Sequence, residues 1–383
     1  MMIQRTAEKE LQILARNFRA VVVVGPRQSG KTTLIRKVFH EKTYVSLENP
    51  DIRQYATEDP RGFISNYPRG AILDEIQRVP TLFSYLQQIL DETSERGLFI
   101  LSGSNNFLLQ ENISQSLAGR VGYLYLLPLS INEINNPEIE ANELIFKGGY
   151  PALYAEKLDV SRFYANYIRT YVERDVRLIK NIGNLQTFER FLKLCAGRIG
   201  QLLNMSSLSV EVGVDSKTID AWLSVLEASF IIFRLQPYHK NYNKRIVKMP
   251  KLYFYDIGLA SALLGIENSE QLTFHPFKGA LFENLVITDF LKKRFNEGKS
   301  NNLFFWRDST GLEIDLLLEK SDKLIPIEMK SGQTVIPNYF TNIAKWMQLS
   351  GTKTGFVVYA GNTVQKRSNG ISVFPYFDAW KIE

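Results

Sequence analysis

Residues 25 to 32 read Gly-Pro-Arg-Gln-Ser-Gly-Lys-Thr and directly follow the apolar run from Ala20 to Val24. Consecutive β-branched residues predict a buried strand, and the apolar spacing from Lys31 to Phe39 suits one face of a helix. A G-x-x-x-x-G-K-T segment between a strand and a helix is the setting of a phosphate-binding P-loop. Gly25 and Gly30 permit backbone angles that turn successive N–H groups toward an anion at the helix N-terminus. The chain is therefore constrained to an α/β nucleotide-binding core.

The loop predicts specific ligands for a nucleotide and its metal ion. We expect Lys31 to reach the β- and γ-phosphates and Thr32 to offer its hydroxyl to Mg²⁺. The cofactors predicted in this way are ATP and Mg²⁺. The predicted nucleotide-binding residues are Gly25, Pro26, Arg27, Gln28, Ser29, Gly30, Lys31, Thr32 and Thr33.

A second apolar run, Gly70 to Gln77, supplies the carboxylates that a P-loop needs. It is typical of a Walker B strand, in which Asp74 would bind Mg²⁺ and Glu75 would orient and deprotonate the attacking water. A third strand, Leu98 to Leu101, ends in Ser102-Gly103-Ser104-Asn105-Asn106, which is either a γ-phosphate sensor or a polar turn. Arg120 is either an arginine finger or a solvated cation.

Composition favours an intracellular protein with several domains. At 383 residues, two or three domains are expected, and 45% hydrophobic residues suffice for their cores. The single cysteine, Cys195, excludes an intramolecular disulfide and lies among leucines typical of a core. Residues 1–19 contain no apolar signal region, and no apolar run approaches the length that spans a bilayer. We therefore predict a cytoplasmic location and no membrane contact.

The net charge of +6 is concentrated locally. Six cations and no acid lie between Arg234 and Lys251, interleaved with aromatic residues, and such a segment can follow a phosphate backbone. Residues 206–215 and 216–228 predict a helix-turn-helix, and strands at 230–235 and 251–255 would flank the basic stretch as a wing. DNA is thus the predicted partner. The alternative is a winged-helix-like unit that only packs domains together.

The last third carries a second set of acids. Residues 311–319 and 324–330 predict two strands joined by a turn at 320–323, and Glu328 and Lys330 share one strand face. Asp315 and Glu328 would hold a divalent metal, Lys330 would position its water, and Glu283 from an upstream helix would complete the set. This pattern favours a PD-(D/E)xK nuclease-like fold, in which the site either cleaves nucleic acid or is silent. The predicted catalytic residues of the whole chain are Lys31, Asp74, Glu75, Glu283, Asp315, Glu328 and Lys330; the predicted metal ligands are Thr32, Asp74, Asp315 and Glu328.

The chain as a whole resembles the prokaryotic AAA-type ATPases that carry a C-terminal uncharacterised domain. Beyond the P-loop, the resemblance rests on the blocks Ile72 to Gln77, Leu101 to Ser104, Leu117 to Arg120, Gly148 to Pro151, Thr170 to Val176, Lys251 to Ala260, Gly279 to Asn284, Glu313 to Asp315 and Ile327 to Lys330. The resemblance covers roughly residues 5 to 375. It implies ATP as the nucleotide and a prokaryotic cytoplasm, and leaves function open.

These placements divide the chain into four parts: an AAA-type P-loop core (1–135), a helical extension (136–200), a winged-helix-like unit (201–270) and a nuclease-like α/β domain (271–383). Two functions remain. In the first, ATP hydrolysis gates a DNA-acting machine with a metal-dependent nuclease. In the second, the protein is a nucleotide-dependent switch whose C-terminal domain binds a protein or DNA partner without cleaving it.

Overall fold

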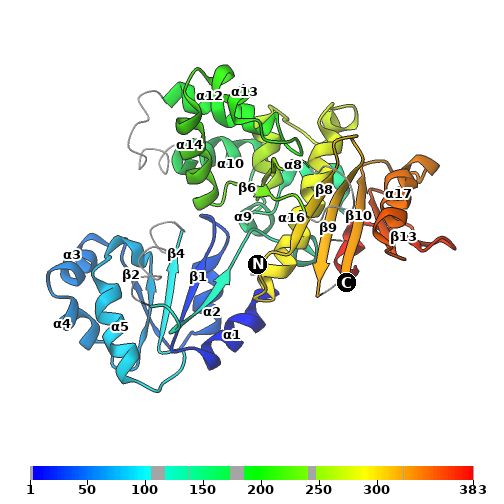
Figure 1. Cartoon of the computed structure of the whole chain (residues 1–383). Coiled ribbons are helices and arrows are strands. Elements are labelled where there is room, and N and C mark those ends of the chain that lie inside the picture. The colour runs from blue at the N-terminus through cyan, green and yellow to red at the C-terminus, as the bar shows by residue number, and fades with distance from the viewer. Residues whose placement is uncertain are drawn as a thin grey trace.

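The computed structural model describes residues 3–104, 117–136, 138–172, 185–239, 247–321 and 323–382. Figure 1 shows an N-terminal α/β region in blue and cyan, a helical middle region in green, and a C-terminal α/β region in yellow to red. The yellow helix α16 (Lys278–Asn296) contacts α1 (Ala7–Asn17) and so joins the two α/β regions. Within the described ranges, no helix has both the length and the hydropathy needed to cross a bilayer.

The N-terminal region contains a parallel sheet of five strands in the order β2-β3-β4-β1-β5. The strands are β1 (Ala20–Val24), β2 (Thr43–Ser46), β3 (Ala71–Asp74), β4 (Phe99–Gly103) and β5 (Val121–Tyr125). The accompanying helices are α1, α2 (Lys31–Val38), α3 (Pro50–Glu58), α4 (Pro60–Ser65) and α5 (Leu82–Glu92). The predicted strands before the P-loop, at Walker B and after residue 98 are all present.

Strand β1 is fully buried because both faces of the sheet are covered. Val21 and Val23 belong to a core cluster with residues of α1 and α2, whereas Val22 and Val24 belong to the larger cluster that includes α5. Since β1, β3 and β4 are parallel, their carboxyl ends lie at one edge of the sheet, where open α/β sheets bind ligands. The P-loop, Walker B acids and Ser104 all follow these ends.

The middle region is mainly helical. Its helices are α7 (Ile131–Ile134), α8 (Ala141–Lys147), α9 (Pro151–Ala155), α10 (Val160–Tyr167), α12 (Leu185–Ala196), α13 (Met205–Val212), α14 (Ser216–Ala228) and α15 (Ile257–Leu263). The predicted helix pair is present as α13 and α14, separated by Gly213 in a left-handed conformation. The predicted flanking strands pair antiparallel as β6 (Ile232–Leu235) and β7 (Lys251–Phe254). Cys195 is buried, as predicted.

The C-terminal region contains a six-stranded mixed sheet in the order β12-β13-β11-β10-β9-β8. Its elements are α16, β8 (Leu303–Arg307), β9 (Glu313–Lys320), β10 (Lys323–Lys330), α17 (Thr341–Ser350), β11 (Gly355–Tyr359), β12 (Gln365–Lys366) and β13 (Ile371–Pro375). Strands β9 and β10 form the predicted hairpin, and β10 pairs parallel with β11. The order is therefore helix, three antiparallel strands, helix, and a strand parallel to the third.

Candidate functional site

The P-loop has the backbone geometry that its sequence predicts. Gly25 passes so close to β5's end that a Cβ there would lie 2.1 Å from the Leu126 carbonyl oxygen, and Gly30 has a φ of +89°. Both positions therefore require glycine. The Lys31 ammonium donates to the carbonyl oxygens of Gly25 (2.9 Å) and Pro26 (2.8 Å), which hold it over the loop. Helix α2 begins at Lys31, so its N-terminal N–H groups face the same space.

Asp74 lies directly against the loop at the end of β3. Its carboxylate accepts hydrogen bonds from the hydroxyls of Thr32 (3.2 Å), Tyr44 (2.7 Å) and Ser102. Burial and the Asp74 hydrogen bond raise the pKa of Tyr44 to about 12, so its hydroxyl stays a donor at neutral pH. Thr32 and Asp74 together present hydroxyl and carboxylate oxygens, the ligand types that Mg²⁺ prefers.

Glu75 is held in a strained position beside the loop. Its φ of +56° is unusual for a residue with a Cβ, and such strain is found preferentially at functional sites. Oε2 of Glu75 accepts from the Ser104 hydroxyl (3.0 Å) and from Gln77 Nε2 (2.5 Å). Ser104 comes from the segment predicted as a γ-phosphate sensor, while Asn105 and Asn106 lie outside the described residues. Three neighbouring strand ends thus place polar groups around one point.

A cavity of about 700 Å³ opens beside these residues. The loop side of its wall includes Lys31, Thr32 and Glu75. The other side comes from the N-terminal segment and the middle region. Its apolar lining residues are Ile3, Pro151, Ala152, Ala155, Leu158 and Phe163, and its charged ones are Arg5, Glu8 and Glu156. A polar, loop-lined end and an apolar end suit a phosphate-bearing ligand with a flat apolar base.

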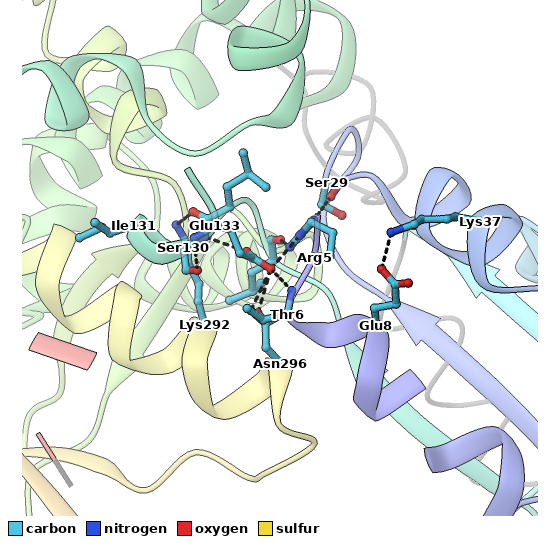
Figure 2. Close-up of polar contacts among 12 residues, drawn as sticks. Arg5, Thr6, Glu8, Ser29, Lys37, Ser130, Ile131, Glu133, Lys292 and Asn296 are labelled. Atoms are coloured by element: carbon cyan, nitrogen blue, oxygen red, sulfur yellow. Dashed lines mark hydrogen bonds and ion pairs between the residues drawn. The ribbon is translucent and has the colours of Figure 1, made fainter. Parts of the chain in front are cut away.

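Arg5 connects the P-loop to the middle of the chain (Figure 2). Its guanidinium donates to the carbonyl oxygens of Ser29 (2.7 Å) and Leu127 (2.7 Å) and to Glu133 Oε1 (3.1 Å). Arg5 is 6% exposed and the Glu133 side chain is fully buried. Burial acts to raise the pKa of Glu133, but the Arg5 charge and hydrogen bonds from Ser130 and Thr6 outweigh it, so the pKa is lowered. Glu133 is therefore a buried carboxylate anion, and its partner cation, Arg5, lies beside the P-loop.

Helix α16 of the C-terminal region joins the same network. Asn296 donates to the Thr6 hydroxyl (2.7 Å) and to Glu133 Oε1 (3.4 Å), as Figure 2 shows. One and two turns earlier, Lys292 donates to the Leu129 carbonyl (2.9 Å) and Asp289 accepts from the Ile131 N–H (2.7 Å). A continuous set of hydrogen bonds therefore runs from the P-loop to α16.

The C-terminal acids also come together, but with lysines among them. Lys330 Nζ lies 2.8 Å from Glu328 Oε2 and 3.8 Å from Asp315 Oδ2, and Asp315 accepts from the Met329 N–H at 2.8 Å. Glu283 Oε1 accepts from Lys251 (3.0 Å) and from the Tyr253 hydroxyl (2.5 Å). The printed contacts of Glu283 are with Lys251 and Tyr253, so its place in the predicted acid set stays a prediction.

The pKa values of Glu283, Glu328 and Lys330 are shifted by burial and by the charges of their neighbours. Burial raises the pKa of Glu283 to about 7, with a further rise from Asp315 opposed by Lys251. Burial, followed by the Asp315 charge, raises the pKa of Glu328 well above its usual range. Burial acts to lower the pKa of Lys330, but the charges of Asp315 and Glu328 outweigh it and raise the pKa. The ammonium groups of Lys251 and Lys330 thus neutralise the cluster.

The predicted metal ligation by Asp315 and Glu328 stays a prediction. In the part of the chain that the structure describes, no three His, Cys, Asp or Glu side chains are placed to hold a metal ion. The ammonium groups of Lys251 and Lys330 pair with carboxylates of this cluster. The site as it stands is a salt-bridge cluster.

The structure also shows the surroundings of the basic stretch and of Arg120. The basic stretch is not a continuous row of solvated cations, because Arg234 is bound to Glu227 (2.5 Å) and Lys251 is buried. Lys248 is exposed, while Lys240, Lys244 and Arg245 lie outside the described residues. Arg120 does not reach its own chain's nucleotide cavity: its carbonyl accepts from Ala20 at the opposite end of β1, and its side chain pairs with Asp91.

Sequence reasoning missed several residues of these sites. Glu133 carried a signal, since Ser130-x-x-Glu133 is a capping box, and both of its hydrogen bonds are present. Lys251 also carried one, as the lone charge opening an otherwise apolar strand. Arg5 and Tyr44 had no local signal, because their partners are distant in sequence.

Domain comparisons agree with these three regions. Residues 17–135 match the AAA domain family, residues 138–270 match a domain of unknown function (DUF8612), and residues 278–378 match another (DUF4143). A protein of Mycobacterium bovis and one of Mycobacterium tuberculosis, both described as uncharacterised, are each 31% identical over 337 residues. The match covers 86% of this chain and 74% of each relative. The chain belongs to their family.

An uncharacterised protein of Methanocaldococcus jannaschii is also similar, 24% identical over 360 residues, or 83% of this chain and 76% of that protein. Among solved structures, a Walker-type ATPase of Pyrococcus abyssi aligns with a TM-score of 0.47 and 14% identity, covering 68% of this chain and 96% of that one. AMPPCP-bound DnaA from Aquifex aeolicus aligns with a TM-score of 0.28 and 13% identity. That alignment covers 58% of this chain and 85% of the DnaA chain. Neither score bears on function.

The predicted AAA-type ATPase domain is confirmed by the family match and by the P-loop between β1 and α2. The predicted C-terminal domain of unknown function is likewise present. The winged-helix and nuclease-like classifications stay predictions.

Proposed function

We propose that this protein is a Mg²⁺-dependent ATPase that acts as a nucleotide-dependent switch. The observation that carries the proposal is the hydrogen-bonded path from the P-loop carbonyl of Ser29 through Arg5 and Glu133 to Asn296 on α16. A ligand that displaces the P-loop would move the Ser29 carbonyl and so change its hydrogen bond to Arg5. Partner binding by the C-terminal region is the output that it would control.

The residues around the cavity fit ATP and Mg²⁺. The α2 N-terminus and Lys31 would hold the β- and γ-phosphates, and the apolar wall with Phe163 would receive the base. Thr32 and Asp74 would hold Mg²⁺, which supplies charge neutralisation to the phosphates when bound. Glu75, oriented by Ser104 and Gln77, would take the proton of the attacking water.

Because the base side of the cavity is formed by residues 151–163, the nucleotide would touch two regions of the chain at once. Closing onto ATP and opening after hydrolysis would move α9 and α10 relative to the P-loop. Such closure is a common way for nucleotide hydrolysis to be coupled to a conformational step.

For the C-terminal region we favour partner binding without cleavage. The element order from α16 to β11, with acids on β9 and β10, supports a nuclease-like fold. Lys251 and Lys330, however, neutralise the acids, and no cleavage step follows from this arrangement. A DNA partner stays a prediction that rests on the basic stretch and on the α13–α14 pair.

The test is ATP binding and hydrolysis by Lys31→Ala. At a hundredfold excess of ATP over its dissociation constant, the wild-type protein should gain about 2.7 kcal/mol of stability, and Lys31→Ala should lose most of this gain and all turnover. Melting temperature with and without Mg-ATP and phosphate release measure the two effects. Wild-type turnover in Lys31→Ala would remove the P-loop from the mechanism.

A further inference from the structure

One buried carboxylate, Asp256, holds three separate segments of the middle region together. Its Oδ2 accepts from the Gly149 N–H (2.8 Å), and its Oδ1 accepts from the Tyr164 hydroxyl (2.6 Å) and the Leu259 N–H (3.0 Å). Asp256 is 2% exposed, and its bond to Leu259 caps the N-terminus of α15. Gly149 and Tyr164 lie 107 and 92 residues away in the sequence, so only the folded chain brings them to this carboxylate.

Two of these segments form the apolar side of the nucleotide cavity. Gly149 lies two residues before Pro151, the first residue of α9, and Tyr164 directly follows Phe163 on α10. Pro151 and Phe163 both line the cavity. The contact that fixes each segment is therefore within two residues of a side chain that the segment presents to a ligand.

The segments approach Asp256 closely because residue 148 is a glycine. Gly148 has a φ of +67°, and a Cβ there would lie 2.2 Å from the Tyr164 hydroxyl oxygen and 2.5 Å from Asp256 Oδ1. Burial, and then the Asp256 charge, raises the pKa of Tyr164 well above its ordinary value, so the hydroxyl stays a donor. The arrangement thus depends on hydrogen bonds to a buried carboxylate, whose loss is costly.

Helix α16 fixes the backbone next to Asp256. The Asn284 side chain on α16 accepts from the Phe254 N–H and donates to the Phe254 carbonyl oxygen, both at 2.8 Å. Asn284 is fully buried, and Phe254 ends β7 two residues before Asp256. The last residue of the same helix, Asn296, contacts Glu133 on the P-loop side. Helix α16 is therefore connected to both sides of the cavity.

We infer that Asp256 is a positioning residue for the base side of the nucleotide cavity, because it holds α9 and α10 with their apolar side chains toward the nucleobase. The inference rests on the proposed function and deepens it, since it assigns recognition of the base to contacts separate from the P-loop. A wall that is ordered before the ligand arrives binds more tightly, because less ordering is left to the binding step. A ligand with phosphates and no base should not depend on Asp256.

The experiment compares ATP with tripolyphosphate, which keeps three phosphates and lacks the base and ribose. Isothermal titration calorimetry measures both dissociation constants for the full chain at one Mg²⁺ concentration. Asp256→Asn keeps the size of the side chain but places an amide N–H among three donors, and Tyr164→Phe removes only the hydroxyl. Each variant should bind ATP about tenfold more weakly than the wild type, as the loss of one charge-assisted hydrogen bond predicts, and tripolyphosphate within about twofold.

Two further variants serve as controls. Tyr376→Phe also removes a buried hydroxyl that donates at 2.6 Å, here to the Ile139 carbonyl oxygen, and both residues lie outside the described set that lines the cavity. It should bind both ligands as the wild type does. Lys31→Ala should weaken both ligands, because it removes a phosphate contact. Melting curves without ligand check folding, and Tyr164→Phe carries the test if Asp256→Asn is recovered unfolded.

The outcomes separate this inference from the proposed function. The inference is overturned if the folded variants bind ATP as tightly as the wild type, or if they weaken tripolyphosphate as much as ATP, which would make Asp256 a general stabiliser of the fold. It is also overturned if the wild type binds ATP no more tightly than tripolyphosphate. A wild type that binds neither ligand removes the proposed function and this inference with it. If Lys31→Ala weakens both ligands, the proposed function stands whatever the Asp256 variants show.

Discussion

Removal of the Arg5 guanidinium should destabilise the junction between the P-loop and α16 more than removal of an exposed cation nearby. Arg5→Met keeps the apolar stem but leaves Glu133 buried without its cation and leaves the carbonyls of Ser29 and Leu127 without donors. Breaking a buried ion pair by removing one partner costs about 3–5 kcal/mol. At about 2–4 °C per kcal/mol for domains of 150–250 residues, the melting temperature should fall by about 6–20 °C.

The matched control is Lys37→Met, which removes the ion pair between Lys37 and Glu8 on the neighbouring surface (Figure 2). That pair has a shorter separation, 2.6 Å, but its side chains are 35% and 26% exposed, so its loss should cost no more than about 1 kcal/mol. Differential scanning calorimetry without nucleotide measures both variants. The double variant Arg5→Met/Glu133→Gln should recover part of the loss, since it no longer buries an unpaired charge.

An Arg5→Met melting temperature that falls no further than that of Lys37→Met would refute the role of the buried ion pair. A loss in Arg5→Met that Glu133→Gln does not lessen would also show that the pair is not the source of the effect. Arg5 also lines the cavity, but Arg5→Met should still bind ATP, because Lys31 and the N-terminus of α2 are left in place.

Two further predictions concern individual acids. Glu75→Gln keeps the hydrogen-bonding shape of the side chain and loses the base, so it should bind ATP normally and hydrolyse it about 10² to 10⁴ times more slowly; an unchanged rate in a phosphate-release assay would place the base elsewhere. Burial raises the pKa of Asp289 to about 6, above its ordinary value. The folded state therefore holds this proton more tightly, and wild-type stability contributed by this group is lost as pH rises from about 4 to 6. Asp289→Asn keeps the acceptor for Ile131 and should be more stable than the wild type at pH 7 but not at pH 4; equal melting curves at both pH values would contradict the shift.

The sequence by itself determined the candidate nucleotide site because the residues predicted to form it are close in sequence or end successive parallel strands. Gly25 to Thr32 form one loop, and Asp74 and Glu75 end a strand whose neighbours are specified by apolar runs. Parallel strands place such ends at one edge, so the meeting of Thr32 with Asp74 follows from local patterns. For the same reason the β9–β10 hairpin, a local pairing, places Asp315 and Glu328 on neighbouring strands, each within 4 Å of Lys330 Nζ.

Only the tertiary structure decided what surrounds these groups. Arg5 meets Glu133 across 128 residues, and Lys251 meets Glu283 across 32 and Glu313 across 62, through packing of separate regions. Periodicity records which face of an element is buried but not which charge lies opposite it. The sequence therefore predicted Lys251 as one of six cations able to follow a phosphate backbone, although burial beside two carboxylates gives that lysine a different role. Charge pairing across domains depends on how the domains pack, and that is the information that local sequence patterns lack.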